Sequence, residues 1–540
     1  MAQKETTNDN KESVRVPISP MAIPSTIKEV TRYPLLEPFV YVVIAQDPTT
    51  GGYHYYVDEL KLNEEEVQIY NTLMDTLKFE LKVPRSDVDP RDYFESSARS
   101  IVEKYRISMG KMKNVAWSKI LYYVERDMVG FGALDPLMRD INIEDISVNG
   151  VGRPVYVFHS RYESMPTNLM FEKEQDLNDL VVKLIHVSGR HISTAFPVVD
   201  ATLPGRHRLM ATYMQEVTPF GSTLTIRKFK TDPVTIVDML NYGTLNSEVA
   251  AYLWFMMENR LSTIVVGATA AGKTTLLNSL VSMIRPDSKI VTIEEVQEIN
   301  LAVKNWVPMI SRPSYGLSGE RMGEVSLFDL VKASLRMRPD VLVVGEVRGE
   351  EAYVLFQAIS TGHGGLCTIH AEDVRSAIRR LTSKPMDVAP AYIPFLDLAI
   401  VVRRVVLQGG DRLKFGRRIL AVEEIIDVDS QVRVFEWNPQ KDVFESHLDR
   451  SVKLPKLAEF RGMSLKQILN EIKRRQSVLE WLRRSNIRHY GDLQKVFTDY
   501  YYRPDETYKR ALESLRQILP PEQISEQTGH EQGGEASATP

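Results

Sequence analysis

Gly267-Ala-Thr-Ala-Ala-Gly-Lys-Thr274 fits the phosphate-binding loop pattern G-x-x-x-x-G-K-[ST] at every fixed position. The apolar run 261–267 predicts a buried strand before the loop, and residues 274–284 predict a helix after it. A strand, a glycine loop and a helix N-terminus direct backbone N–H groups and the positive end of a helix dipole into one small space, which suits a polyphosphate. We therefore predict a nucleotide site. A chance match in a glycine-rich turn is the alternative, and the flanking strand and helix argue against it.

The loop residues have separate expected roles. The Lys273 ammonium would reach the β- and γ-phosphates, and the Thr274 hydroxyl would hold Mg²⁺. The residues predicted to bind the nucleotide are Gly267, Ala268, Thr269, Ala270, Ala271, Gly272, Lys273, Thr274 and Thr275.

Short apolar runs alternate with helical patterns from about residue 245 to 405. The expected strands are 290–293, 341–344 and 366–370, and the expected helices are 326–338, 349–360 and 374–383. Alternation of this kind predicts an α/β fold in which helices cover both faces of a parallel sheet. We expect a hairpin at 412–427 to end this region.

The rest of the chain is predicted to divide into further segments. These are a flexible lead-in at 1–30, an N-terminal α+β region at 31–113, a second N-terminal α+β domain at 114–232, a linker at 233–245, the nucleotide domain at 246–430, a mostly helical C-terminal extension at 431–518 and a disordered tail at 519–540.

Composition and charge exclude some classes of function. The 540 residues carry a net charge of −4, which gives no overall electrostatic case for nucleic-acid binding. Cys367 is the single cysteine, so an internal disulfide or a cysteine-based zinc site is excluded and a reducing compartment is favoured. Neither a signal peptide nor an apolar run of about 18 residues is found. We expect any membrane attachment to come through a partner.

Two predicted strands end in carboxylates. Glu346 follows the apolar run 341–344, and Glu294 and Glu295 follow the run 290–293. Because the ends of parallel strands meet at one sheet edge, these side chains are expected beside the phosphates, where one could serve Mg²⁺ and another the attacking water. A solvated strand end is the alternative for each of them.

Two histidines, His363 and His370, flank the run 364–369. No third ligand lies at zinc spacing, so metal binding by this pair is poorly supported. A neutral imidazole that senses the γ-phosphate or holds Glu346 is chemically sensible. A structural role is the alternative.

Four motifs in order resemble those of the type II/type IV secretion ATPases. GATAAGKTT, TIEE, LRMRPDVLVVGEVRG and TGHGGLCTIHA are similar to the Walker A, Asp box, Walker B and His box of that family. The resemblance implies a RecA-like domain, ATP as the nucleotide, and catalytic roles for Glu294, Glu346, His363 and His370. Glu295 stands where the family usually has Asp.

The resemblance extends upstream. Segments 132–147, 197–204 and 222–229 are similar to the N-terminal domain of the archaeal branch, and the family's four-cysteine zinc module is missing. Arg208 and Arg227 match family arginines that reach the nucleotide as the domains close. Such a guanidinium would stabilise charge developing on the γ-phosphate. Arg348 is a weaker candidate for this task, and a surface ion pair is its alternative.

The resemblance implies a ring, a hexamer, that acts on the cytoplasmic face of a membrane. There it would power assembly or export of pilin-like subunits through a polytopic membrane platform protein. A nucleic-acid translocase or helicase on the same core is one alternative. Its support is the basic helical segment 466–490, for which a solvated face is the simpler interpretation. A nucleotide-gated switch without turnover is the other alternative.

Overall fold

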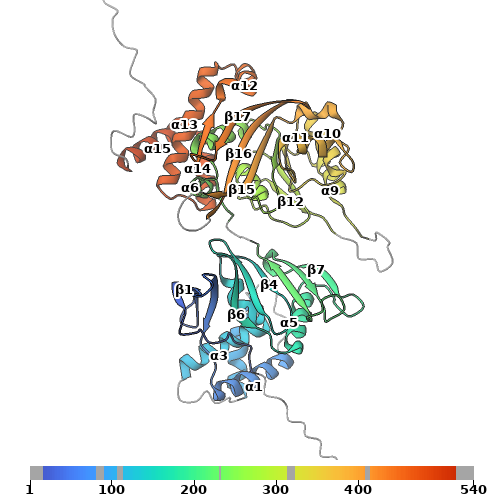
Figure 1. Ribbon diagram of the computed structural model, residues 1–540, viewed down its shortest axis with the longest axis vertical. Helices are drawn as coiled ribbons and strands as arrows, with labels where there is room; N and C mark the ends of the chain where they lie inside the picture. Colours follow the sequence, from blue (N-terminus) through green and yellow to red (C-terminus); the bar gives the residue numbers. More distant parts are fainter. Residues whose placement is uncertain are drawn as a thin grey trace, which may run out of the picture. The chain divides into compact units, whose positions relative to one another are not determined.

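The computed structural model describes residues 16–80, 90–105, 113–229, 233–312, 323–407 and 414–518 (Figure 1). These residues belong to two compact units, which divide between residues 230 and 231. Each unit has its own sheet and is described by itself. No helix within the described ranges is both long and apolar enough to cross a membrane.

In the described part of the N-terminal unit, nine strands form one sheet in the order β1-β2-β3-β6-β5-β4-β9-β8-β7. The strands are β1 (Lys28–Leu36), β2 (Val40–Gln46), β3 (Tyr53–Glu59), β4 (Ile143–Val148), β5 (Pro154–His159), β6 (Glu163–Met170), β7 (Val198–Thr202), β8 (Arg208–Thr212) and β9 (Thr223–Arg227). The helices are α1 (Glu64–Glu80), α2 (Pro90–Lys104), α3 (Lys113–Met128), α4 (Asp135–Arg139) and α5 (Glu174–Val187). The segments 31–113 and 114–232 thus share one sheet and one core.

Residues 16–21 differ from the expected flexible lead-in. The Met21 N–H donates to the Asn168 carbonyl at 2.8 Å, and the Asn168 amide donates back to the Met21 carbonyl. The Ile18 carbonyl accepts from Arg126, which is itself buried against Glu59. Buried polar groups need partners, so these bonds tie the segment to the unit.

The C-terminal unit contains the predicted parallel sheet. Within its described residues the strand order is β12-β11-β13-β14-β10-β15-β16-β17-β18. The strands are β10 (Thr263–Val266), β11 (Ile290–Glu294), β12 (Trp306–Ile310), β13 (Val341–Val344), β14 (Gly364–Ile369), β15 (Leu398–Leu407), β16 (Lys414–Asp427), β17 (Ser430–Asn438) and β18 (Val443–Ser446). Strands β12 to β15 in that order pair in parallel, and β16 to β18 add on antiparallel.

Helices cover both faces of this sheet, which confirms the predicted α/β class. They are α6 (Ile236–Asn241), α7 (Ser247–Glu258), α8 (Lys273–Val281), α9 (Leu327–Ser334), α10 (Glu351–Ser360) and α11 (Val374–Thr382). One core lies between the sheet and α7 and α8, and a second lies between the sheet and α9, α10 and α11. β10 and β13 are buried over their whole length, which explains why all their residues except Thr263 are apolar.

The expected hairpin at 412–427 is wrong. Residues 414–427 form one long strand, β16, which pairs with β15 on one side and with β17 on the other. β16 turns back into β17 at 427–430, where Val428 and Asp429 form the turn.

The C-terminal helices pack on the same unit. They are α12 (Lys453–Arg461), α13 (Leu465–Arg484), α14 (Tyr490–Tyr502) and α15 (Pro504–Ile518). Arg475 of α13 is 2% exposed and contacts Glu258 at the end of α7 at 2.8 Å. Its guanidinium also lies over the Trp254 and Tyr500 rings. The predicted extension therefore shares its core with the sheet. The expected tail at 519–540 lies outside the described residues.

Candidate nucleotide site

The loop between β10 and α8 has backbone geometry that glycine permits. Gly272, the residue before α8, has φ 91° in the left-handed region. Gly267 leads out of β10, and a Cβ placed there would lie 2.5 Å from the Val402 carbonyl oxygen. Ala270 also has a positive φ, 59°. Residues 268–270 between these points are exposed, so the loop opens to solvent at the N-terminus of α8.

Lys273 is the first residue of α8, and its side chain turns back over the loop. Its Nζ donates to the Ala268 carbonyl at 3.2 Å and lies 3.3 Å from Nε2 of His370. Burial lowers the Lys273 pKa, and the nearby Glu346 carboxylate partly offsets that effect. A desolvated ammonium beside free helix N–H groups favours an anionic ligand.

Glu346 follows β13 at the same edge. Its Oε1 lies 2.8 Å from Nε2 of His370, and its Oε2 forms an ion pair with Arg348. Oε1 is buried and has no other hydrogen-bond donor among the described residues. Apart from the His370 ring, a metal-bound water or a cation would be a suitable partner for this buried oxygen.

His370 follows β14, which pairs with both β13 and β10. Burial and the neighbouring Lys273 lower its pKa below the ordinary value for histidine. Both effects favour the neutral ring. With the proton on Nε2, the imidazole would donate toward Glu346 and accept from Lys273 at Nδ1, 3.4 Å away.

Glu294 lies at the end of β11 and is 4% exposed. Its Oε1 accepts from the Glu298 and Ile299 N–H groups, each at 3.0 Å. Burial raises its pKa to about 8, against these two hydrogen bonds that lower it. In this structure the carboxyl therefore shapes the segment after β11. A catalytic role for it stays a prediction.

Arg348 joins two of the predicted acids. One of its nitrogens pairs with Glu346, and the other lies 3.7 Å from Glu295. The Glu346 contact raises the Arg348 pKa. In this structure Arg348 therefore forms surface ion pairs, as in the alternative interpretation. Glu295 is its more distant partner.

His363 is not brought to this edge. It precedes β14, and Gly364, the next residue, pairs with Val341 at the start of β13. A strand of six residues separates His363 from His370, which amounts to roughly 20 Å at ~3.3 Å per residue. Its ring contacts Thr361 and the Ala358 carbonyl, each at 3.2 Å. Only the histidine after the parallel strand faces the loop.

Arg208 and Arg227 belong to the N-terminal unit. They are register partners on β8 and β9, so their side chains share one face of that sheet. Asp200 pairs with Arg208 at 2.7 Å, and Asp145 pairs with Arg227 at 3.3 Å. The two carboxylates offset the repulsion between adjacent like charges.

The residues present fit Mg²⁺ and a nucleotide. In the described part of the chain, no group of three or more His, Cys, Asp or Glu side chains could hold a metal ion. Mg²⁺ rarely uses such a cage, because it binds through one or two protein oxygens, water and substrate phosphates. The half-buried Thr274 hydroxyl and the Glu346 carboxylate supply protein oxygens of this kind.

The sequence motifs missed one contact of this loop. Arg417 of β16 donates from Nε to the Ala270 carbonyl at 3.4 Å. No sequence motif includes Arg417, and its place beside the loop follows from the pairing of β15 with β10 and with β16.

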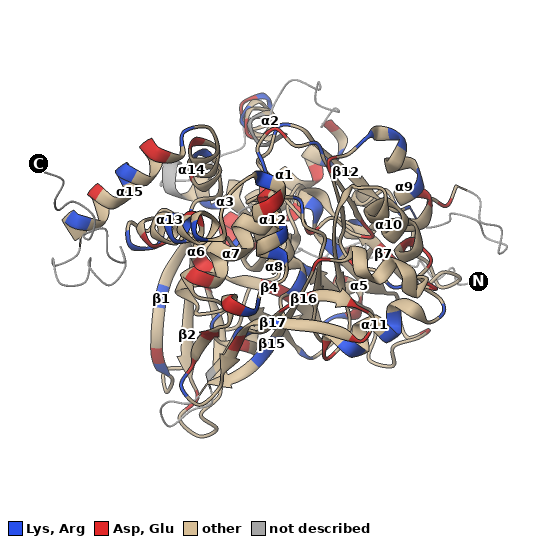
Figure 2. Ribbon diagram, turned by 90° about the horizontal axis from the view of Figure 1, so that it is seen from above, with Lys and Arg blue, Asp and Glu red and all other residues tan. Residues whose placement is uncertain are grey.

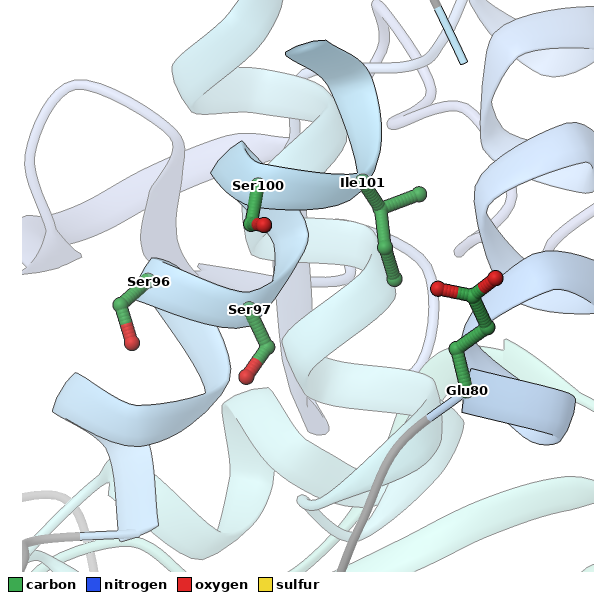
Figure 3. Close-up of a pocket in the computed structure, with 5 residues that line it drawn as sticks. All are labelled: Glu80, Ser96, Ser97, Ser100 and Ile101. Atoms are coloured by element: carbon green, nitrogen blue, oxygen red, sulfur yellow. The ribbon is translucent and has the colours of Figure 1, made fainter. Parts of the chain in front are cut away.

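A small pocket lies elsewhere, in the N-terminal unit. It is lined by Glu80 at the end of α1 and by Ser96, Ser97, Ser100 and Ile101 of α2 (Figure 3). The Ser96 and Ser97 hydroxyls both donate to the Tyr93 carbonyl, so these two groups serve the helix itself.

Several known proteins are similar to this chain in sequence or structure. The family described as "Type II/IV secretion system protein" matches residues 132–408. An uncharacterized protein of Methanocaldococcus jannaschii is 37% identical over 392 residues, which cover 71% of this chain and 70% of that one. A putative conjugal transfer protein of Mycobacterium tuberculosis is 31% identical over 47% of this chain and 72% of its own length. The X-ray structure of the Legionella pneumophila ATPase DotB has 21% identity and a TM-score of 0.40 over 52% of this chain and 77% of that one.

Proposed function

Because the chain belongs to the type II/IV secretion system protein family, we propose that it is a Mg²⁺-dependent ATPase that drives a secretion or pilus machine. The observation that supports this most directly is the convergence of Lys273, Glu346 and His370. They follow β10, β13 and β14, which are neighbours in the parallel sheet. In sheets of this kind, ligands bind outside the carboxyl ends of the strands.

Each of the three groups has a proposed task. Lys273 neutralises phosphate charge, and the N–H groups of the loop and of α8 bind the phosphate oxygens. Glu346 orients the attacking water. His370, kept neutral by burial and by Lys273, holds Glu346 toward that water. A bound Mg²⁺, held by Thr274 and Glu346, would supply charge stabilisation between the phosphates.

Arg208 and Arg227 are proposed to supply guanidinium groups to the γ-phosphate. They lie on an exposed sheet face of the N-terminal unit, where they pair with Asp200 and Asp145. We further propose that the protein assembles as a ring, a hexamer, on the cytoplasmic face of a membrane. Its partner there would be a polytopic platform protein that handles pilin-like subunits. These assembly proposals come from the family.

The alternative function, a nucleic-acid motor, was based on the basic helical segment 466–490, and the structure weakens that basis. Acidic and basic residues are interspersed on α13 and α15 (Figure 2). The arginines of the basic segment pair with carboxylates: Arg474 with Asp505, Arg475 with Glu258, and Arg483 and Arg484 with Glu480. ATPase activity that rises with added DNA and falls steeply with salt would revive this alternative.

Phosphate release with and without Mg²⁺ tests the proposal. The Glu346→Gln protein should bind a fluorescent ATP analogue within about threefold of the wild type, yet lose ~100-fold or more of its turnover, which is typical for a lost general base. Glu350→Gln is the matched control, because Glu350 is an exposed glutamate four residues further on. Normal turnover in Glu346→Gln would remove Glu346 from the reaction, and a wild type without Mg²⁺-dependent turnover would exclude the ATPase.

A further inference from the structure

The β15–β16 ribbon runs past the edge of the sheet, beside the phosphate loop. β10 ends at Val266, whose partner on β15 is Val401, and β15 continues beyond that point for several residues. β16 pairs with this extension, which places Arg417 directly opposite Arg404. Directly opposite residues share one face of a ribbon, so both arginines project from the same side.

Arg417 bonds the loop at Ala270 and lies close to Gly272. Its Nε donates to the Ala270 carbonyl at 3.4 Å. Its Cδ lies 2.9 Å from where a Cβ on residue 272 would stand, so Gly272 leaves the space that Arg417 occupies. The guanidinium remains exposed at the mouth of the loop.

Ala270 is the strained point of the loop. Its φ of 59° is left-handed, a conformation that costs free energy for any residue with a Cβ. On the inner side, Lys273 Nζ and the Ala271 N–H both bond the Ala268 carbonyl, at 3.2 and 3.3 Å. From outside the loop, Arg417 donates to the Ala270 carbonyl.

We propose that Arg417 is a positioning residue that holds Ala270 in its left-handed conformation and so keeps the loop ready for phosphate before a nucleotide arrives. This inference rests on the proposed function, because a ready loop matters only if nucleotide binds. It differs from a direct contact, in which Arg417 would touch the phosphates themselves.

A double-mutant cycle on mant-ADP affinity, measured with Mg²⁺, separates these possibilities. Arg417→Gln should weaken binding about tenfold, the equivalent of one lost charge-assisted hydrogen bond. In an Ala270→Gly background, where glycine adopts the left-handed conformation freely, the same change should cost less than about twofold. An equal loss in both backgrounds shows direct contact and overturns the proposal, as does no loss in either.

Arg404→Gln is the matched control, because it removes the same charge from the facing position of the ribbon, where Arg404 lies over the Phe415 ring. It should change affinity less than about twofold, and a loss equal to that of Arg417→Gln would reduce the effect to net charge and overturn the proposal.

Hydrogen exchange of the loop peptide 267–273 in nucleotide-free protein gives a readout that needs no nucleotide. Arg417→Gln should speed exchange of the Ala271 amide several-fold, while Arg404→Gln should not. Unchanged exchange in Arg417→Gln overturns the proposal even if the protein is an ATPase. If the wild type binds no mant-ADP, the proposed function is overturned. In that case hydrogen exchange of the Ala271 amide still tests whether Arg417 positions the loop.

Discussion

Nε2 of His370 lies 2.8 Å from Oε1 of Glu346, across the ends of the neighbouring strands β14 and β13. That oxygen is buried and has no other hydrogen-bond donor among the described residues. Burial and Lys273 lower the His370 pKa, which favours the neutral ring beside the carboxylate. The pair is therefore arranged so that the imidazole can orient Glu346 without neutralising its charge.

Removing this imidazole should slow turnover. His370→Ala is expected to lower kcat ~10- to 100-fold with little change in KM, since the orientation of Glu346 matters only in the reaction. His363→Ala is the control, because His363 lies at the opposite edge of the sheet. It should keep kcat within about twofold. Steady-state phosphate release measures both, and equal losses would contradict the assignment made from strand direction.

The buried Glu294 should make stability depend on pH. Its folded-state pKa of about 8 lies above the ordinary value of 4.5, so between these values the folded protein holds a proton that the unfolded chain releases. The contribution to the free energy of unfolding is fully present below pH 4.5 and is lost as pH rises toward 8. Glu294→Gln removes the titration. Its melting temperature relative to the wild type should therefore rise by about 5 °C or more from pH 5 to pH 9.

Scanning fluorimetry of nucleotide-free protein checks this expectation. Glu298→Gln is the control, because Glu298 is exposed and its charge raises the Glu294 pKa less than burial does, so this variant should keep most of the pH dependence. A difference between Glu294→Gln and wild type that stays constant from pH 5 to pH 9 would contradict it.

Alanine substitutions at Gly272 and Gly462 separate the cost of backbone strain from the cost of a side-chain clash. Both have a positive φ, 91° and 64°, so alanine should cost each ~1–2 kcal/mol in the free energy of unfolding. A Cβ at Gly462 meets nothing within 4 Å, whereas one at Gly272 lies 2.9 Å from Arg417. Gly272→Ala should therefore also lose mant-ADP binding, while Gly462→Ala should bind normally. Urea unfolding and fluorescence titration measure the two effects, and normal binding by Gly272→Ala would contradict the loop assignment.

Arg475 should contribute most of the electrostatic stability of the C-terminal helices. It is buried and pairs with both Glu258 and Glu471, so truncation would break two ion pairs and leave a cavity beside the Trp254 and Tyr500 rings, while Glu258 keeps Arg461 and Glu471 keeps Arg474. We expect Arg475→Ala to lower the free energy of unfolding by ~3–5 kcal/mol. Arg483→Ala, which breaks a partly exposed pair with Glu480, should cost ~0–1 kcal/mol. Urea denaturation of both variants measures the two losses in the free energy of unfolding. Similar losses would mean that burial does not strengthen the ion pairs of Arg475.

Much of the C-terminal sheet was predictable because its strands are short, apolar and bounded by motifs. Residues 341–344 and 290–293 are strands as expected, and Glu346 and His370 meet because both follow parallel strands. His363 belongs to the same motif, but a strand lies between it and His370. Motif membership therefore did not distinguish the two sheet edges.

The sequence by itself determined the α/β class of the C-terminal unit and the loop between β10 and α8, since periodicity and glycine positions act over short distances along the chain. It could not determine that Arg417, about 145 residues after the loop, contacts Ala270. Nor could it determine that Glu294 turns its carboxyl onto its own following segment. Such contacts depend on strand order and on which polar groups are left without water, and only the tertiary structure decides both.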